Sequence, residues 1–317
     1  MAPFPAVDVR RRFSVMPRLE ALAVYKGEIA CTNEDLIRNA AFCWSPMTAE
    51  EILHKTGIEQ RLYTELDLDH MALLAAQAAL RKSGRRPEEI GAVLFCSCTS
   101  AKMMPSLATW LSGQMGIFQT HASCDIVAAC AGLPYGLAEA VRLLQETERP
   151  ALVIAPAPEG APPDIEVFQT YASGPMSEVD SIIWPNPEFD NNITVYGPEV
   201  RNLAKRYLTQ MIDELTSLPH PDGRPGSLMD AIELIVPHQA NKTMVVSLAQ
   251  AAGVAPERLY FNIAKVGNTS SASIPIALHD AVREGVITRP MRIFTPGFGA
   301  GAVGGSVVMR FDPAVVA

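Results

Sequence analysis

Apolar and polar positions repeat along this chain with two different periods. Residues 68–83, LDHMALLAAQAALRKS, carry an alanine- and leucine-rich stripe at helical spacing, and Gly84 ends it. The shorter apolar runs IGAVLFCSC (90–98) and IELIV (232–236) have the length of buried strands. Segments of the two kinds alternate from residue 48 to residue 311, which predicts an α/β fold. Further helices are predicted at 48–53, 199–215, 243–252 and 273–284.

Two stretches of the chain share one order of elements. EEIGAVLFCSCTSAKMMPSLATWLSGQMG (88–116) and DAIELIVPHQANKTMVVSLAQAAG (230–253) each pass from an acidic helix end to an apolar strand, a polar loop, a helix and a glycine. Such an echo predicts a duplicated α/β unit rather than two unrelated domains. We therefore divide the chain into an N-terminal half, residues 1–160, and a C-terminal half, residues 161–317.

The composition of the 317 residues restricts the class of protein. With 48% apolar and 19% charged residues, the chain is too apolar for intrinsic disorder. Its net charge of −8 argues against nucleic acid as a partner. No apolar stretch reaches the roughly 20 residues that span a bilayer, and no apolar signal segment follows the basic N-terminal residues. We therefore expect a cytoplasmic protein without membrane association.

The six cysteines all lie within the first 130 residues, and their spacings form no disulfide framework. Cys96 and Cys98 belong to an apolar run without a second Cys or His pair, so we interpret them as buried strand residues and expect no metal site. Reduced thiols are consistent with the cytoplasm.

Three polar positions and one glycine-rich stretch could carry chemistry. Cys130 precedes a long apolar helix, whose N-terminus would favour the thiolate, although a packed core cysteine fits the local sequence equally well. His238 directly follows the strand that Pro237 ends, and its plainer interpretation is a surface or core histidine. Asn268 lies in a Gly-Asn turn and could simply cap a helix. The stretch GFGAGAVGG (297–305) is either a tight crossing or a loop whose N–H groups meet an oxyanion.

Together, DIVAACAG (125–132), VPHQAN (236–241), GNTSSAS (267–273) and the terminal glycine-rich stretch resemble the β-ketoacyl-acyl-carrier-protein synthase III family of the thiolase superfamily. The resemblance extends from Thr32 to Phe311. It implies a duplicated, five-layered α/β/α/β/α thiolase-like fold and a homodimer. It also implies a catalytic triad of Cys130, His238 and Asn268.

The resemblance further implies a decarboxylative Claisen condensation. Cys130 would take the acyl group of an acyl-CoA, with its oxyanion held by the backbone N–H groups of Cys130 and Ala300. A malonyl thioester on acyl carrier protein would then lose carbon dioxide, and His238 and Asn268 would stabilise the enolate. Coenzyme A is part of a substrate here, and no cofactor or metal is implied. Fatty-acid, biotin-precursor and secondary-metabolite synthesis all remain open as pathways.

Further roles follow from the same resemblance. Phe298 should lie beside Cys130 in the acyl pocket, and Met104 should reach the acyl pocket of the partner subunit. Four basic residues could dock the acidic carrier protein, although a solvated helix face explains them equally well. They are Arg201, Lys205, Arg206 and Lys242.

One departure keeps other functions open. After the helix that follows Cys130, the family has a strand, a loop and a GDGA-type turn, whereas here ERP (148–150) leads directly into ALVIAPAPEG (151–160). A missing segment would open the wall of the acyl pocket. The alternatives are an acyltransferase that passes the acyl group from Cys130 to an amine or alcohol, and a non-catalytic partner in a synthase complex. A non-decarboxylating thiolase is disfavoured, because no second cysteine follows Cys130.

Overall fold

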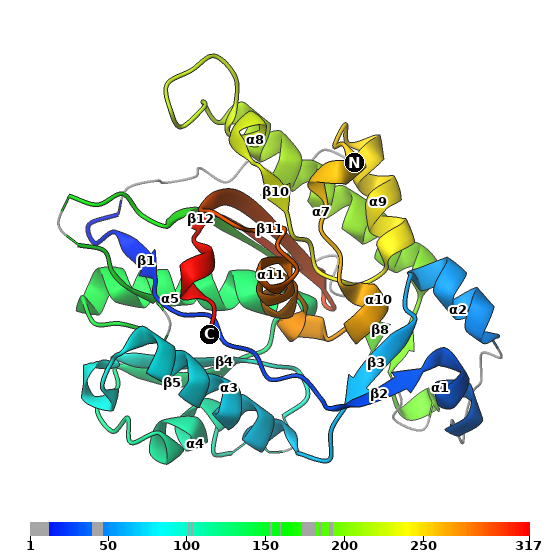
Figure 1. The fold of residues 1–317 in the computed structure, drawn as a ribbon, viewed down its shortest axis with the longest axis horizontal. Helices are drawn as coiled ribbons and strands as arrows, with labels where there is room; N and C mark the ends of the chain where they lie inside the picture. Colours follow the sequence, from blue (N-terminus) through cyan, green and yellow to red (C-terminus); the bar gives the residue numbers. More distant parts are fainter. Residues whose placement is uncertain are drawn as a thin grey trace.

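Strands and helices alternate along the chain, as predicted, in the computed structural model of the protein (Figure 1). The structure describes residues 13–39, 47–100, 102, 104–152, 154–158, 160–172, 182–183, 186–189 and 193–317. The helices are α1 (Asn33–Asn39), α2 (Ala49–Thr56), α3 (Leu68–Ser83), α4 (Leu107–Gln114), α5 (Gly132–Thr147), α7 (Gly197–Ser217), α8 (Leu228–Ala231), α9 (Lys242–Ala251), α10 (Ile263–Val266) and α11 (Ser273–Arg283).

Helix ends agree with the signals in the sequence. Helix α3 covers the predicted residues 68–83, and Gly84 ends it in the left-handed conformation that favours glycine. Helix α2 begins one residue later than predicted, because Thr48 caps it and forms a capping box with Glu51. Helix α7 is longer than the predicted 199–215, because Pro198 is a good first-turn residue and the helix begins at Gly197.

A four-stranded sheet forms the centre of the C-terminal half. Its order is β10 (Leu234–Ile235), β11 (Met291–Gly299), β12 (Val303–Phe311) and β7 (Ile165–Ala172). Strands β11 and β12 form an antiparallel hairpin that is paired from Met291 and Phe311 to Gly299 and Val303. Strand β10 runs parallel to β11, so that its carboxyl end, which leads into His238, lies beside the glycine-rich end of β11.

The strands of the N-terminal half form smaller groups. Strands β4 (Ala92–Cys96) and β5 (Ala122–Ile126) are parallel, and β1 (Pro17–Leu19) pairs with β6 (Ile154–Pro156) in antiparallel orientation. A parallel bridge between Ala92 and Ala151 joins the two groups. Two further ribbons are β2 (Ile29–Thr32) with β3 (Gln60–Tyr63), and β8 (Ile182–Ile183) with β9 (Thr194–Val195).

Three separate apolar cores lie between successive layers of the molecule. The first packs α3 and α4 on one face of β4, through residues such as Val93 and Leu111. The second holds α5 and α11 between β4 and the C-terminal sheet, with Leu144, Ala277 and Ile293 among its members. The third packs α7 and α9 on the outer face of that sheet. Helices and sheets therefore succeed one another as five layers, with α5 and α11 in the middle (Figure 1).

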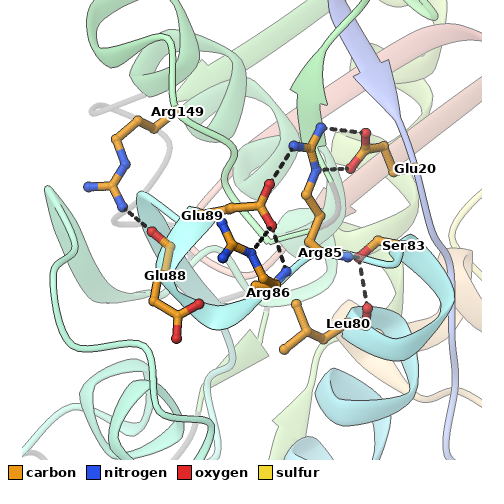
Figure 2. Close-up of polar contacts among 8 residues, drawn as sticks. All are labelled: Glu20, Leu80, Ser83, Arg85, Arg86, Glu88, Glu89 and Arg149. Atoms are coloured by element: carbon orange, nitrogen blue, oxygen red, sulfur yellow. Dashed lines mark hydrogen bonds and ion pairs between the residues drawn. The ribbon is translucent and has the colours of Figure 1, made fainter.

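The chain leaves α5 along a tightly fixed path. The guanidinium of Arg149 donates to the backbone carbonyls of Glu88 and Ile90, at 2.9 and 3.2 Å, and Figure 2 shows it pointing toward Glu88. Nearby, Arg85 binds both carboxylate oxygens of Glu20 and so fixes the end of α3 to the segment after β1 (Figure 2). These contacts thus hold the chain against β4 immediately after Arg149.

The departure seen in the sequence has a structural counterpart. Residues 151–152 bridge to β4, and β6, only two residues further on, already pairs with β1. One continuous segment of the N-terminal half thus contacts both β4 and β1. The C-terminal half instead uses two strands, β11 and β12, which form a hairpin. The chain passes to the C-terminal sheet between β6 and β7, at residues 157–164. The division at residue 160 stays a prediction.

Candidate active site

The candidate nucleophile lies in a short turn in front of α5. Cys130 is the middle residue of the 3₁₀ turn η2 (Ala129–Ala131), and Ala129 has a positive φ of 41°. The Cys130 Sγ lies 3.5 Å from the hydroxyl of Ser270. Burial raises the pKa of the Cys130 thiol above its ordinary value, and the hydrogen bond with Ser270 opposes this shift. Burial therefore acts against the thiolate that a helix N-terminus favours, and the resting residue is a thiol.

A second turn of the same form faces the first one. The turn η5 (Ser270–Ala272) leads into α11 as η2 leads into α5, and its first residue, Ser270, again has a positive φ, of 50°. The Ser271 hydroxyl donates to the carbonyl of Ala129 at 2.7 Å. The two turns therefore form a matched pair from the two halves of the chain. Cys130 lies where they meet.

His238 is buried at the carboxyl end of the β10 segment. Its N–H donates to the carbonyl of Pro296 at 2.9 Å, which continues the ladder between β10 and β11. Its Nδ1 lies 2.7 Å from the Ser273 hydroxyl, which also accepts the N–H of Gln239 at 3.3 Å. Burial lowers the pKa of His238 to about 4, so that the imidazole is neutral at physiological pH. In the tautomer with the imidazole proton on Nε2, Nδ1 accepts the proton of the Ser273 hydroxyl.

The buried side chain of Gln239 extends the hydrogen-bond network around His238. Gln239 is fully buried; its side chain donates to the carbonyl of Pro237 at 2.7 Å and accepts the N–H of Asn262 at 3.2 Å. Asn262 in turn donates to the carboxylate of Asp280 at 2.9 Å. The segment that carries His238 is therefore fixed to α11 by polar contacts as well as by packing.

Asn268 lies at the surface, in the loop that leads into η5. Its Oδ1 accepts the N–H of Ser270 at 2.9 Å, which is the pattern of an Asx turn. Because a backbone N–H requires an acceptor, this contact assigns Oδ1 and leaves the Nδ2 group as a donor. The loop thus ties the third predicted residue directly to the serine that contacts Cys130.

The glycine-rich end of β11 packs on the turn that carries Cys130. A Cβ on Gly297 would lie 3.1 Å from the carbonyl oxygen of Cys130, and one on Gly299 would lie 2.8 Å from its nitrogen. A side chain at Gly299 would displace the turn, and one at Gly297 would require the turn to move by a few tenths of an ångström. These two close approaches bring the backbone that continues into Ala300 alongside the backbone of Cys130.

A narrow pocket reaches His238 from the outer layer. It has a volume of about 60 Å³, and its walls come from α7, α9 and the end of β11. Phe298 lines it and packs against Tyr207, with ring centroids 5.5 Å apart. The full lining is Ala204, Tyr207, Leu208, Met211, Pro237, His238, Ala240, Met244, Val245, Leu248, Pro296, Gly297 and Phe298. Gly297 contacts both this pocket and the turn of Cys130.

Other predicted residues lie away from this centre. Met104 is 87% exposed and does not line the pocket beside His238. Arg201 and Lys205 are exposed in the N-terminal half of α7, Lys242 is exposed at the first residue of α9, and Arg206 is half-buried. Sequence reasoning missed Ser270 and Ser273, although the hydroxyl-rich run NTSSAS directly before a helix was a signal for polar groups at that helix start.

Comparison with known proteins shows which proteins the chain is similar to. Residues 224–311 match the family model for the C-terminal part of 3-oxoacyl-[acyl-carrier-protein] synthase III. The β-ketoacyl-[acyl-carrier-protein] synthase III of Aquifex aeolicus is 29% identical over 291 residues, which cover 83% of this chain and 90% of the relative. The protein of the same name from Yersinia pseudotuberculosis is 29% identical over 293 residues, with the same coverage. This chain is a homologue of the β-ketoacyl-acyl-carrier-protein synthases III.

Solved structures agree with this assignment. The 3-oxoacyl-[acyl-carrier-protein] synthase III of Aquifex aeolicus superposes with a TM-score of 0.79 at 27% identity and covers 93% of this synthase III homologue and 100% of its own chain. The priming β-ketosynthase of the R1128 polyketide pathway, at 22% identity and a TM-score of 0.77, shares the fold over 98% of this chain. The predicted thiolase-like fold is therefore confirmed. Within the described part of the chain, none of the helices combines the length and apolar character that a bilayer crossing requires.

Proposed function

We propose that this synthase III homologue is an acyltransferase that condenses an acyl-CoA primer with malonyl-acyl-carrier-protein through an acyl group on Cys130. The observation that carries the proposal is the meeting of η2 and η5, which brings the Cys130 thiol within 3.5 Å of Ser270, the residue that Asn268 binds. His238 approaches the same centre along β11, because Gly297 contacts both its pocket and the Cys130 backbone.

In the first half-reaction, the Cys130 sulfur attacks the thioester carbonyl of the primer. The new carbon–sulfur bond forms as the bond to the coenzyme A sulfur breaks, and the thiol proton leaves with coenzyme A. The backbone N–H groups of Cys130 and Ala300 hold the oxyanion of this step. Their proximity is supported by the close approach of Gly299, whose Cβ position lies 2.8 Å from the Cys130 nitrogen. No metal or organic cofactor takes part in this scheme.

In the second half-reaction, the malonyl thioester loses carbon dioxide and its enolate attacks the acyl carbon. The developing oxyanion requires hydrogen-bond donors, and a neutral His238 with its proton on Nε2 is one. The Nδ2 group of Asn268 is the other. Donors of this kind are worth about 3–4 kcal/mol each in comparable sites. The pathway that we propose is the priming of fatty-acid or polyketide synthesis; the similar ketosynthase from the R1128 system is named as the priming enzyme of a polyketide pathway.

Carrier-protein docking fits the outer side of α7 and α9. These helices line the pocket that ends at His238, and their N-terminal halves carry the exposed residues Arg201, Lys205 and Lys242. In a chain of net charge −8, such a local basic group would attract an acidic carrier protein. Reversal of two charges, Arg201→Glu with Lys205→Glu, should raise the KM for malonyl-acyl-carrier-protein several-fold and leave the rate with malonyl-CoA unchanged.

A homodimer would cover an exposed apolar edge of the molecule. Strand β5 is paired only with β4 among the described strands. Phe118, Val127 and Met104 lie near it in the sequence and are 81%, 76% and 87% exposed. Large apolar side chains of this exposure next to an open strand are typical of a subunit interface. Val127→Asp should convert the dimer to a monomer in sedimentation analysis.

We assign the protein to the cytoplasm, where its free thiols stay reduced.

Intact-protein mass spectrometry tests the activity. Incubation with a panel of acyl-CoA donors should add one acyl mass, and Cys130→Ala should abolish it, whereas Cys124→Ala, which removes an exposed thiol, should retain it. Malonyl-dependent release of carbon dioxide then separates a condensing enzyme from an acyltransferase to amines or alcohols. The absence of an adduct with every donor would favour the non-catalytic alternative.

A further inference from the structure

A second pocket lies on the inner side of the nucleophile turn. Its volume of about 260 Å³ is several times that of the pocket beside His238, at about 60 Å³. Its walls come from β4 and residues 151–152, from α5, and from η5 with the start of α11. Its lining residues are Leu94, Cys96, Gly132, Leu133, Gly136, Leu137, Ala140, Ala151, Leu152, Ser271, Ala272 and Pro275.

The pairing of the two turns explains why this space exists. In the C-terminal half, the β11–β12 hairpin fills the space against η2 and α5, where Gly305 approaches Pro134 so closely that a Cβ would lie at 2.8 Å. The corresponding surface of η5 and α11 includes Ser271, Ala272 and Pro275. Among the described residues, no hairpin of the N-terminal half covers it, because the chain passes directly from Ala151 to β6. The pocket therefore occupies the position that a second hairpin would fill.

The chemistry of the lining selects an apolar ligand. Leucine, alanine, glycine and proline supply most of the surface, and no charged side chain takes part. Gly132, Gly136 and Ala140 lie at intervals of four residues on α5 and form a strip of small side chains along the wall. Burial raises the pKa of the Cys96 thiol to about 12, as expected of a weakly solvated apolar site. Alkyl groups are the ligands that gain most from such surroundings.

One end of the pocket adjoins Cys130. Gly132, two residues after the nucleophile, contacts Ser271 and Cys96, since a Cβ on it would lie 2.7 Å from the Ser271 side chain. The Cys130 sulfur itself points toward Ser270, the neighbour of Ser271. A group attached to this sulfur therefore begins at the segment that forms the end wall of the pocket.

We propose that this pocket holds the alkyl chain of the acyl group on Cys130, so that the enzyme prefers primers with a medium or long apolar chain to acetyl primers. The assignment rests on the proposed acyl-Cys130 chemistry. A chain of this kind lies between α5, α11 and β4, in a pocket that shares no lining residue with the pocket beside His238. Chain length is then limited by Leu137 and Ala140 on α5.

The rate of Cys130 acylation with acetyl-, butyryl-, octanoyl- and dodecanoyl-CoA tests the proposal. The unmodified protein should favour octanoyl over acetyl donors by about tenfold. Ala140→Leu fills the pocket and should lower the octanoyl rate by about tenfold, with the acetyl rate unchanged. Leu137→Ala enlarges the pocket and should shift the preference toward dodecanoyl-CoA.

Leu144→Ala is the matched control for Leu137→Ala. Both leucines are buried on α5 in the same core, but only Leu137 lines the pocket. The control should lose comparable stability without a change of chain-length preference. If Ala140→Leu fails to fold, the comparison of the two Leu→Ala variants decides. Two results would overturn the pocket assignment and leave the proposed function intact. One is acylation with an unchanged chain-length preference in both pocket variants, and the other is a preference of the unmodified protein for acetyl-CoA. Failure of every donor overturns it together with the proposed function.

Discussion

Ser273 holds the imidazole of His238 by a hydrogen bond of 2.7 Å to Nδ1, and both residues are buried. The serine is the first residue of α11, while the histidine follows β10, 35 residues earlier in the chain. The Ser273 oxygen also accepts the N–H of Gln239. We infer that Ser273 is a positioning residue that keeps the His238 proton on Nε2.

Removal of this hydroxyl should affect the second half-reaction only. Ser273→Ala should lower malonyl decarboxylation by about tenfold, the equivalent of one hydrogen bond, because the imidazole loses its fixed tautomer. Acylation of Cys130 should be unchanged. Ser273→Thr keeps the hydroxyl and should restore most of the rate. Equal losses in both half-reactions would show that the serine acts only through packing.

The buried histidine should make stability depend on pH. The pKa of His238 is about 4 in the folded protein and near 6.5 in the unfolded chain. Between these two pH values the unfolded chain therefore binds a proton that the folded protein does not bind. The contribution is fully present above pH 6.5 and is lost as the pH falls toward 4, by about 3 kcal/mol at most. Urea unfolding of the protein and of His238→Gln at pH 7 and pH 5 measures this. The variant should lose less stability over this interval, and identical losses would contradict the assignment.

Asn268 offers an almost isosteric test of its donor role. Asn268→Asp retains an oxygen that accepts the Ser270 N–H, and therefore preserves the turn, but it removes the Nδ2 donor. Carbon dioxide release should fall by about 10²–10³-fold, with normal transfer of the acyl group to Cys130. Asn268→Ala, which removes both contacts, is the companion variant. An active aspartate variant would exclude a donor role for this side chain.

Gly299 should tolerate no side chain. A Cβ there would lie 2.8 Å from the Cys130 nitrogen and 3.0 Å from the Ala128 oxygen, so Gly299→Ala must displace the turn of the nucleophile. We expect loss of Cys130 acylation and a lower melting temperature. Gly113→Ala is the control, because no atom lies within 4 Å of its Cβ position, within α4. It should stabilise the protein by up to about 1 kcal/mol.

Local features of the fold could be predicted where the signal lies within a few residues. The stripe and the terminal glycine of α3 gave both of its ends correctly, and the apolar run before His238 located a strand. By contrast, the partners of those strands depend on contacts across more than 50 residues. The pairing of β7 with β12 and the bridge from Ala92 to Ala151 are of this kind, and no local pattern encodes them.

The same distinction applies to the site. By itself, the sequence determined which residue types are present and which of them end a strand or begin a helix: a thiol before α5, an imidazole after β10 and an amide before α11. Only the tertiary structure decided that Ser270 and Ser273 are the partners of Cys130 and His238, and that a pocket lined by α5 and α11 adjoins the thiol. Period and capping act over one or two turns of chain, whereas the two side-chain contacts join residues 140 and 35 positions apart and arise only when whole elements pack against one another.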